Sequence, residues 1–219
     1  FYNLEIYFEK QNQIFSKLTK TQKEYYYFIL KNLQKIKECF DDIILLTNGK
    51  QYINNKQLQI WIIKNKEILK FLNRFQKTSL GIVELKILKF YKQMDKIIIL
   101  KNKYFVENEI KKFKILFDKI EDNPLTYAQR KAIVTDEDST LVVAGAGTGK
   151  TSTVVGKVSY LVTKNQIKPD EILALAYGKD AAQEMRERVK EKTGIDTEIR
   201  TFHALGKKII EDISKNKIK

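Results

Sequence analysis

Two patterns of hydrophobic residues divide the chain near residue 121. Upstream of this point, apolar residues recur every three or four positions, as they do on the buried face of an amphipathic helix. This half holds only two glycines and no proline, which are the residues that usually interrupt helices. We therefore predict an all-α domain over residues 1–121. The apolar positions that define its helices include Leu69, Leu72, Phe75, Ile87, Phe90, Tyr91, Phe105, Ile110, Phe113 and Phe117.

The second half alternates short runs rich in β-branched residues with longer helical ones. Pro124 and the gathering of seven of the nine glycines beyond residue 140 mark the change. Such alternation is typical of βαβ units and predicts a parallel sheet with crossover helices, so we expect an α/β domain to begin at residue 122. The predicted strands are residues 140–143, 171–177 and 199–202, and the predicted helices are residues 151–162, 180–192 and 204–213.

A glycine-rich run lies between the first of these strands and the helix that follows it. Alternating glycines let backbone N–H groups approach phosphate oxygens, and the start of a helix carries partial positive charge. This context predicts a phosphate loop for a nucleoside triphosphate; the alternative is a tight glycine turn that binds nothing. The predicted nucleotide-binding residues here are Ala144, Gly145, Ala146, Gly147, Thr148, Gly149, Lys150, Thr151 and Ser152.

Two side chains of this run have specific expected roles. Lys150 should reach the β- and γ-phosphates and is the candidate catalytic residue. The hydroxyl of Thr151 should ligate Mg²⁺. Ala144 departs from the general pattern, which has glycine at that place.

The chain is strongly basic, with a net charge of +14. Residues 1–120 hold 24 basic and 12 acidic residues, a net of +12, whereas residues 121–219 hold 17 and 15, a net of +2. Contact with nucleic acid would explain this excess. The alternative, a genome biased toward lysine, explains lysine in place of arginine better than it explains twice as many bases as acids. The longest purely apolar runs have four residues, the first residues lack a signal-peptide pattern, and the lone Cys39 has no partner for an internal disulfide. We predict a cytoplasmic protein with no membrane span.

Three further motifs narrow the choice of family. Residues 123–133, with Gln129 placed 21 positions before Lys150, resemble the adenine-reading Q motif of superfamily 1 DNA helicases of the UvrD/Rep type. Residues 172–189 resemble motif Ia of these helicases, and residues 201–206 resemble motif Ib. The Ala-Gly-Ala-Gly-Thr-Gly-Lys-Thr loop behind a helical N-terminal region is most similar to the helicase IV branch.

This resemblance implies a P-loop, RecA-like motor domain that uses ATP and Mg²⁺. The parent protein would move 3′ to 5′ along single-stranded or partly duplex DNA and unwind it. Gln129 would bind adenine, and Tyr177, Lys179, Thr201 and His203 would contact DNA. The alternatives are that Tyr177 packs against the sheet and that His203 is a buried, hydrogen-bonded residue. Asp180 stands where the family has a basic residue, so no phosphate contact is predicted there.

The chain begins with Phe1 and ends before any acidic pair or arginine that would complete ATP hydrolysis. We expect an N-terminal fragment with an incomplete motor domain that hydrolyses ATP negligibly by itself. Two other functions remain open. One is a nucleic-acid-binding adaptor module with a vestigial nucleotide site, and the other is a phosphate-loop enzyme that acts on something other than DNA.

Overall fold

A computed structural model describes residues 16–75, 82–145, 147–165 and 167–216. The chain divides into two compact units, residues 1–103 and residues 104–219, and the division falls within helix α5 (Ile82–Lys112). The predicted boundary at residue 121 lies inside the second unit, between helices α6 (Lys114–Lys119) and α7 (Tyr127–Val134). No helix among the described residues combines the length and the hydrophobicity needed to cross a membrane.

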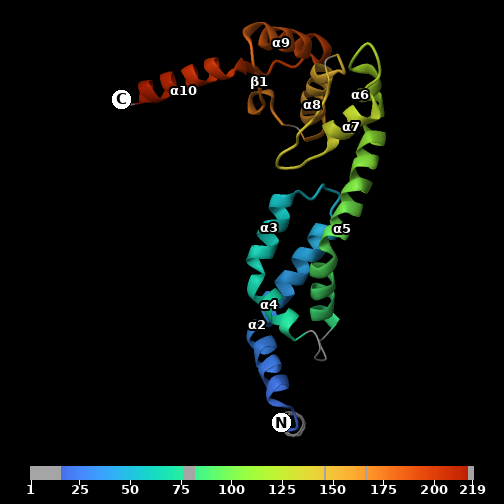
Figure 1. The fold of residues 1–219 in the computed structure, drawn as a ribbon, viewed down its shortest axis with the longest axis vertical. Coiled ribbons are helices and arrows are strands. Elements are labelled where there is room, and N and C mark those ends of the chain that lie inside the picture. The colour runs from blue at the N-terminus through green and yellow to red at the C-terminus, as the bar shows by residue number, and fades with distance from the viewer. Residues whose placement is uncertain (1–15, 76–81, 146, 166, 217–219) are drawn as a thin grey trace, which may run out of the picture. The chain divides into compact units, whose positions relative to one another are not determined.

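The first unit is helical, as the 3.6-residue pattern predicted (Figure 1). It comprises helix α2 (Lys20–Asn48), helix α3 (Asn55–Lys64), helix α4 (Lys66–Arg74) and most of α5. Capping boxes begin two of these helices, because Thr19 and Asn54 each bind the backbone N–H of a glutamine three residues later, which in turn binds back. Residues only three positions apart therefore determine where these two helices begin.

One hydrophobic core joins these four helices. Trp61 meets Phe90 edge to face with ring centroids 5.2 Å apart, and Phe28 of α2 stacks on Phe71 of α4. All the apolar positions identified from the sequence in this unit are buried except Tyr91, which is partly buried. The fully buried members of the core are Ile36, Cys39, Ile43, Trp61, Ile68, Leu69, Leu72, Ile87, Leu88 and Phe90.

The second unit contains one parallel βαβ arrangement. Strand β1 (Leu173–Ala176) pairs with strand β2 (Glu198–Thr201), so that Leu173 lies opposite Glu198 and Ala176 opposite Thr201. Helix α9 (Lys179–Thr193) makes the crossover and ends at Gly194, whose φ of 70° gives it a left-handed conformation. The predicted helices 151–162, 180–192 and 204–213 correspond to α8 (Lys150–Asn165), α9 and α10 (Phe202–Asn216), and the last two predicted strands to β1 and β2.

The prediction of a strand at residues 140–143 was wrong, and a full phosphate-loop sheet is not present among the described residues. Leu141 and Val143 are 88% and 89% exposed. A β-strand needs a neighbouring strand for its backbone hydrogen bonds. Neither β1 nor β2 pairs with this segment, so its hydrophobic sequence alone does not produce a strand.

A cluster around Tyr160 packs α8 against the end of α5 and against α6. The Tyr160 hydroxyl donates a 2.7 Å hydrogen bond to Glu109 Oε2 at the end of α5, and Phe113 and Phe117 pack against the Tyr160 ring. Lys164 lies 3.5 Å from the same Glu109 oxygen. Burial, and then the bond to Glu109, raise the pKa of Tyr160 well above its usual range. Residues 104–120 therefore form part of the unit that carries the nucleotide motif.

Candidate nucleotide-binding site

The phosphate loop, residues 144–151, leads directly into the first turn of α8. Gly147 and Gly149 have φ values of 72° and 85°, which residues with a side chain rarely adopt. At Gly149 a Cβ atom would also lie 2.4 Å from Gln129 Nε2. The positive φ therefore favours glycine at position 149, and a Cβ there would in addition displace the amide end of the Gln129 side chain. Ala146 lies outside the described residues.

The loop is closed by contacts among its own residues. Lys150 Nζ donates to the carbonyl oxygens of Gly145 at 2.7 Å and Ala144 at 3.3 Å, and Thr148 Oγ1 donates to Gly145 O at 2.9 Å. The lysine ammonium thus faces neutral carbonyls of the loop. A phosphate would offer it an anionic acceptor in exchange, and charge-assisted hydrogen bonds are the stronger kind. Thr151 is half-buried in the same first turn of α8.

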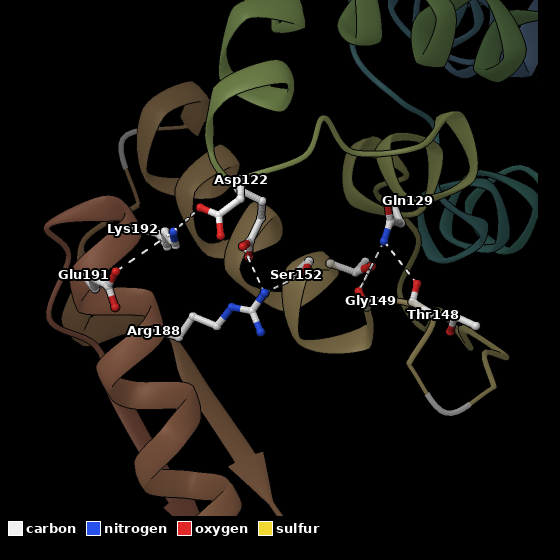
Figure 2. A network of polar contacts seen from close by, with 10 residues as sticks. Asp122, Gln129, Thr148, Gly149, Ser152, Arg188, Glu191 and Lys192 are labelled. Carbon is white, nitrogen blue, oxygen red and sulfur yellow. Dashed lines mark hydrogen bonds and ion pairs between the residues drawn. The ribbon is translucent and has the colours of Figure 1, made fainter.

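Gln129 links α7 to the phosphate loop (Figure 2). Its Oε1 accepts hydrogen bonds from Thr126 N at 2.7 Å and Thr126 Oγ1 at 3.0 Å, which completes the capping box of α7. Its Nε2 lies 3.3 Å from the carbonyl oxygens of both Thr148 and Gly149. The structure therefore places the predicted adenine-binding residue against the loop, and its contact with adenine stays a prediction.

A second set of polar contacts holds α8 from the other side (Figure 2). Arg188 Nη2 on α9 donates to Ser152 Oγ at 3.1 Å and to Glu121 Oε2 at 2.9 Å. One helical turn later, Lys192 Nζ lies 2.7 Å from Asp122 Oδ1. The bond to Glu121 raises the pKa of Arg188, and the bond to Lys192 lowers that of Asp122.

Sequence reasoning missed these contacts. Glu121 and Asp122 stood out only as part of a compositional boundary, and Arg188 only as part of motif Ia. The available signal was charge complementarity, since two adjacent acids match two bases that lie four residues apart on one helix. A separation of 67 positions between Glu121 and Arg188 makes such a pairing hard to see without a structure.

The predicted DNA-contact residues fall into separate places. Lys179 and Thr201 both line a cleft of about 470 Å³ between α9, β2 and the start of α10. Thr201 is buried, and its Oγ1 accepts a hydrogen bond from Ala204 N. Tyr177 is 99% exposed, so it does not pack against the sheet. His203 is exposed as well and lines a different hollow, along α10, so it is not a buried histidine.

Two arginines that the sequence analysis did not single out also line this cleft. Arg186 Nη1 donates to Gln183 Oε1 at 2.8 Å and Nη2 donates to Ile199 O, so α9 is tied to β2. Arg200 Nε lies 2.5 Å from Glu198 Oε1. Together with Lys179 they make the cleft basic, which suits an anionic ligand.

A glycine loop at the start of a helix, with Lys150 hydrogen-bonded to its carbonyls, is similar to a phosphate loop, although no strand precedes it among the described residues. Residues 125–218 match the model of the UvrD/REP helicase N-terminal domain. The matched stretch contains the phosphate loop, Gln129 and the four residues predicted to contact DNA.

Three relatives illustrate the similarity. DNA helicase IV of Escherichia coli strain K12 is 42% identical over 115 residues, which are 52% of this chain and 17% of that protein. The ATP-dependent DNA helicase Rep of Buchnera aphidicola is 37% identical over 91 residues, which are 40% of this chain and 14% of Rep. The ATP-dependent DNA helicase PcrA of Staphylococcus aureus strain Mu50 is 34% identical over 91 residues, which are 40% of this chain and 12% of PcrA. The matched stretch thus spans less than a fifth of each relative.

Proposed function

We propose that this chain is the ATP-binding N-terminal part of a DNA helicase that couples ATP hydrolysis to movement 3′ to 5′ along single-stranded DNA and to unwinding of duplex DNA. The observation that carries the proposal is the phosphate loop with Lys150, set within a segment that matches the UvrD/REP helicase N-terminal domain. The names of the relatives, all DNA helicases, support the choice of substrate.

The residues of the loop fit a magnesium nucleotide. Glycines at 147 and 149 leave no Cβ atoms on the backbone that would receive the phosphates, and Lys150 exchanges neutral carbonyls for phosphate oxygens. Thr151, in the first turn of α8, would offer its hydroxyl to Mg²⁺. When bound, the ion supplies charge neutralisation on the phosphates. Gln129 must share or release its contacts with Thr148 and Gly149 before its amide can bind adenine.

We assign DNA contact to the start of α9 and of α10. Tyr177 presents an exposed ring on which a base can stack, and Lys179 and Thr201 line the basic cleft beside it. His203, on the first turn of α10, is the fourth residue of this set. A cytoplasmic location accords with a DNA substrate and belongs to the same proposal.

The test is ATP hydrolysis by the full-length protein with and without single-stranded DNA. Strong stimulation by DNA that Lys150→Ala abolishes is the expected result. Lys119→Ala, which removes an exposed lysine on α6, is the matched control and should retain the stimulation. Displacement of a duplex with a 3′ tail but not of one with a 5′ tail would support the polarity. ATP turnover that ignores DNA would instead indicate a phosphate-loop enzyme with another substrate.

An adaptor function is the second candidate, and the charge distribution favours it. The net charge of +12 over residues 1–120 gives the first half the electrostatic character of a nucleic-acid-binding module. The full-length protein carrying Lys150→Ala separates the two functions. If the Lys150→Ala variant keeps its full salt-sensitive DNA binding, and the unsubstituted protein shows no ATP turnover, the chain functions as an adaptor.

A further inference from the structure

Arg188 is the only described residue whose side chain joins α9 to the first turn of α8 and to the connection before α7 at once, among the hydrogen bonds that the structure shows. The same nitrogen, Nη2, contacts Ser152 Oγ and Glu121 Oε2 (Figure 2). Ser152 follows Lys150 by two positions, and its side chain is buried. A displacement of Arg188 would therefore remove a contact from the helical turn that carries Lys150 and Thr151.

Burial of Glu121 makes this contact hard to replace. The Glu121 side chain is only 7% exposed, and its second oxygen, Oε1, is buried without a hydrogen-bond partner in the described structure. A buried carboxylate that loses its cation bears an uncompensated charge. Arg188 is thus fixed in place by Glu121, rather than free to take other rotamers.

Lys192 adds a second attachment of α9 to the same connection. It follows Arg188 by four residues, so both side chains leave the same face of the helix. Its partner Asp122 adjoins Glu121. Because Asp122 is largely exposed, this pair contributes little energy to the attachment of α9.

The connection that holds α9 also reaches the opposite side of the phosphate loop. Eight residues after Glu121, Gln129 binds the carbonyls of Thr148 and Gly149. The first turn of α8 is consequently held at Gly149 by α7 and at Ser152 by α9. In the other direction, Arg188 lies nine residues from Lys179, about 13.5 Å along the axis of α9.

We propose that Arg188 is a positioning residue for the nucleotide site, which acts through Ser152 and links the proposed DNA-binding start of α9 to the phosphate loop. The link to DNA rests on the proposed function, whereas the effect on nucleotide does not. Arg188 itself touches neither the phosphates nor DNA in this assignment. It sets where Lys150 and Thr151 lie relative to α9, so nucleotide affinity and the response to DNA both depend on it.

The experiment measures binding of a non-hydrolysable ATP analogue with Mg²⁺ to the full-length protein, with and without oligothymidine. The variants are Arg188→Met, Arg188→Lys, Ser152→Ala and the double variant Arg188→Met/Ser152→Ala. Ser159→Ala is the matched control, because it removes a buried hydroxyl from the same helix away from Arg188. Thermal unfolding of each variant shows that the fold is retained.

We expect Arg188→Met to raise the Kd for the analogue about tenfold and to reduce the effect of oligothymidine on that Kd. Arg188→Lys should restore part of the affinity. The double variant should bind the analogue no more weakly than Arg188→Met, because each substitution removes the same contact, the one between Arg188 and Ser152. Ser159→Ala should bind as the unsubstituted protein does. Ser152→Ala leaves the pair of Arg188 and Glu121 intact, so it still gives a result if Arg188→Met does not fold.

Two results would overturn the inference: an unchanged Kd in folded Arg188→Met and Ser152→Ala, or losses that add in the double variant. They are distinguishable from failure of the proposed function. If the unsubstituted protein ignores oligothymidine and Arg188→Met still weakens nucleotide binding, the helicase function fails and the positioning role stands. If DNA enhances binding equally in Arg188→Met and in the unsubstituted protein, the inference fails and the function stands.

Discussion

Asn102 and Ile53 are joined by two hydrogen bonds, one in each direction. Ile53 N donates to Asn102 Oδ1 at 2.9 Å, and Asn102 Nδ2 donates to Ile53 O at 2.8 Å. Both residues are buried, so the amide of an α5 side chain satisfies a backbone N–H and a backbone C=O that face no water. The connection between α2 and α3 is thereby attached to α5.

Asn102→Asp should destabilise the helical unit, although it only replaces the side-chain NH₂ group with an oxygen. The aspartate loses the donor to Ile53 O and places a charge in a buried site, so we expect a loss of about 2 kcal/mol in unfolding free energy. Chemical denaturation followed by circular dichroism measures it. Asn32→Asp, at a half-buried position on α2 where the amide meets only the carbonyl of its own helix, should cost less. Equal losses at the two positions would contradict the importance of the paired contact.

Gly149→Ala should abolish nucleotide binding. Its φ of 85° is costly for alanine, by about 1 kcal/mol, and the added Cβ, 2.4 Å from Gln129 Nε2, would displace the Gln129 amide from its contacts with the loop. Gly194→Ala is the control: φ is 70° there, but nothing lies within 4 Å of the added Cβ. Calorimetric titration with the magnesium analogue should show loss of binding only for Gly149→Ala, and loss for both would point to backbone strain in general.

Asp118 should stabilise the second unit in a manner that depends on pH. Its hydrogen bond to Lys114, and then its bond to Arg130, lower the pKa of Asp118 below its ordinary value of 3.8. A carboxyl whose pKa is depressed on folding contributes stability above its unfolded pKa, and this contribution is lost as the pH falls through the lower, folded value. Asp118→Asn should therefore reduce the unfolding free energy at pH 7, and the difference from the unsubstituted protein should vanish in stronger acid.

Measurement of unfolding between pH 2 and pH 7 checks this prediction. Asp212→Asn, an exposed carboxylate on α10, serves as the control and should show a smaller difference at neutral pH. A difference for Asp118→Asn that stays constant down to pH 2 would mean that packing, not charge, is responsible.

Tyr177→Ala should weaken binding of single-stranded DNA without changing stability. Its ring is almost fully exposed, so its removal costs no core packing, while stacking on a base contributes roughly 1–3 kcal/mol. We expect a tenfold or greater rise in the Kd for oligothymidine by fluorescence anisotropy. Tyr104→Ala, another exposed tyrosine, should leave the Kd unchanged. Equal affinity of Tyr177→Ala and the unsubstituted protein would remove Tyr177 from the proposed interface.

The sequence predicted those features that depend on neighbouring residues. The glycine loop and the helices α8, α9 and α10 follow from local spacing, and the structure contains them. The strand expected at residues 140–143 depends on partner strands, which local hydrophobicity does not supply. The contact of Arg188 with Glu121 is equally non-local. Whether Gln129 binds adenine stays a prediction, because its amide now serves the loop and the α7 cap.

The packing of residues 104–121 against α8 has a practical consequence for truncation. A recombinant piece that starts at residue 122, where the composition changes, would delete the carboxylate of Glu121 from beside Arg188 and Glu109 from beside Tyr160. It would also remove Phe113 and Phe117 from the Tyr160 ring and expose the hydrophobic surface of α8 around Tyr160. Such a piece should aggregate, whereas one that starts at residue 104 retains the whole support of the nucleotide motif.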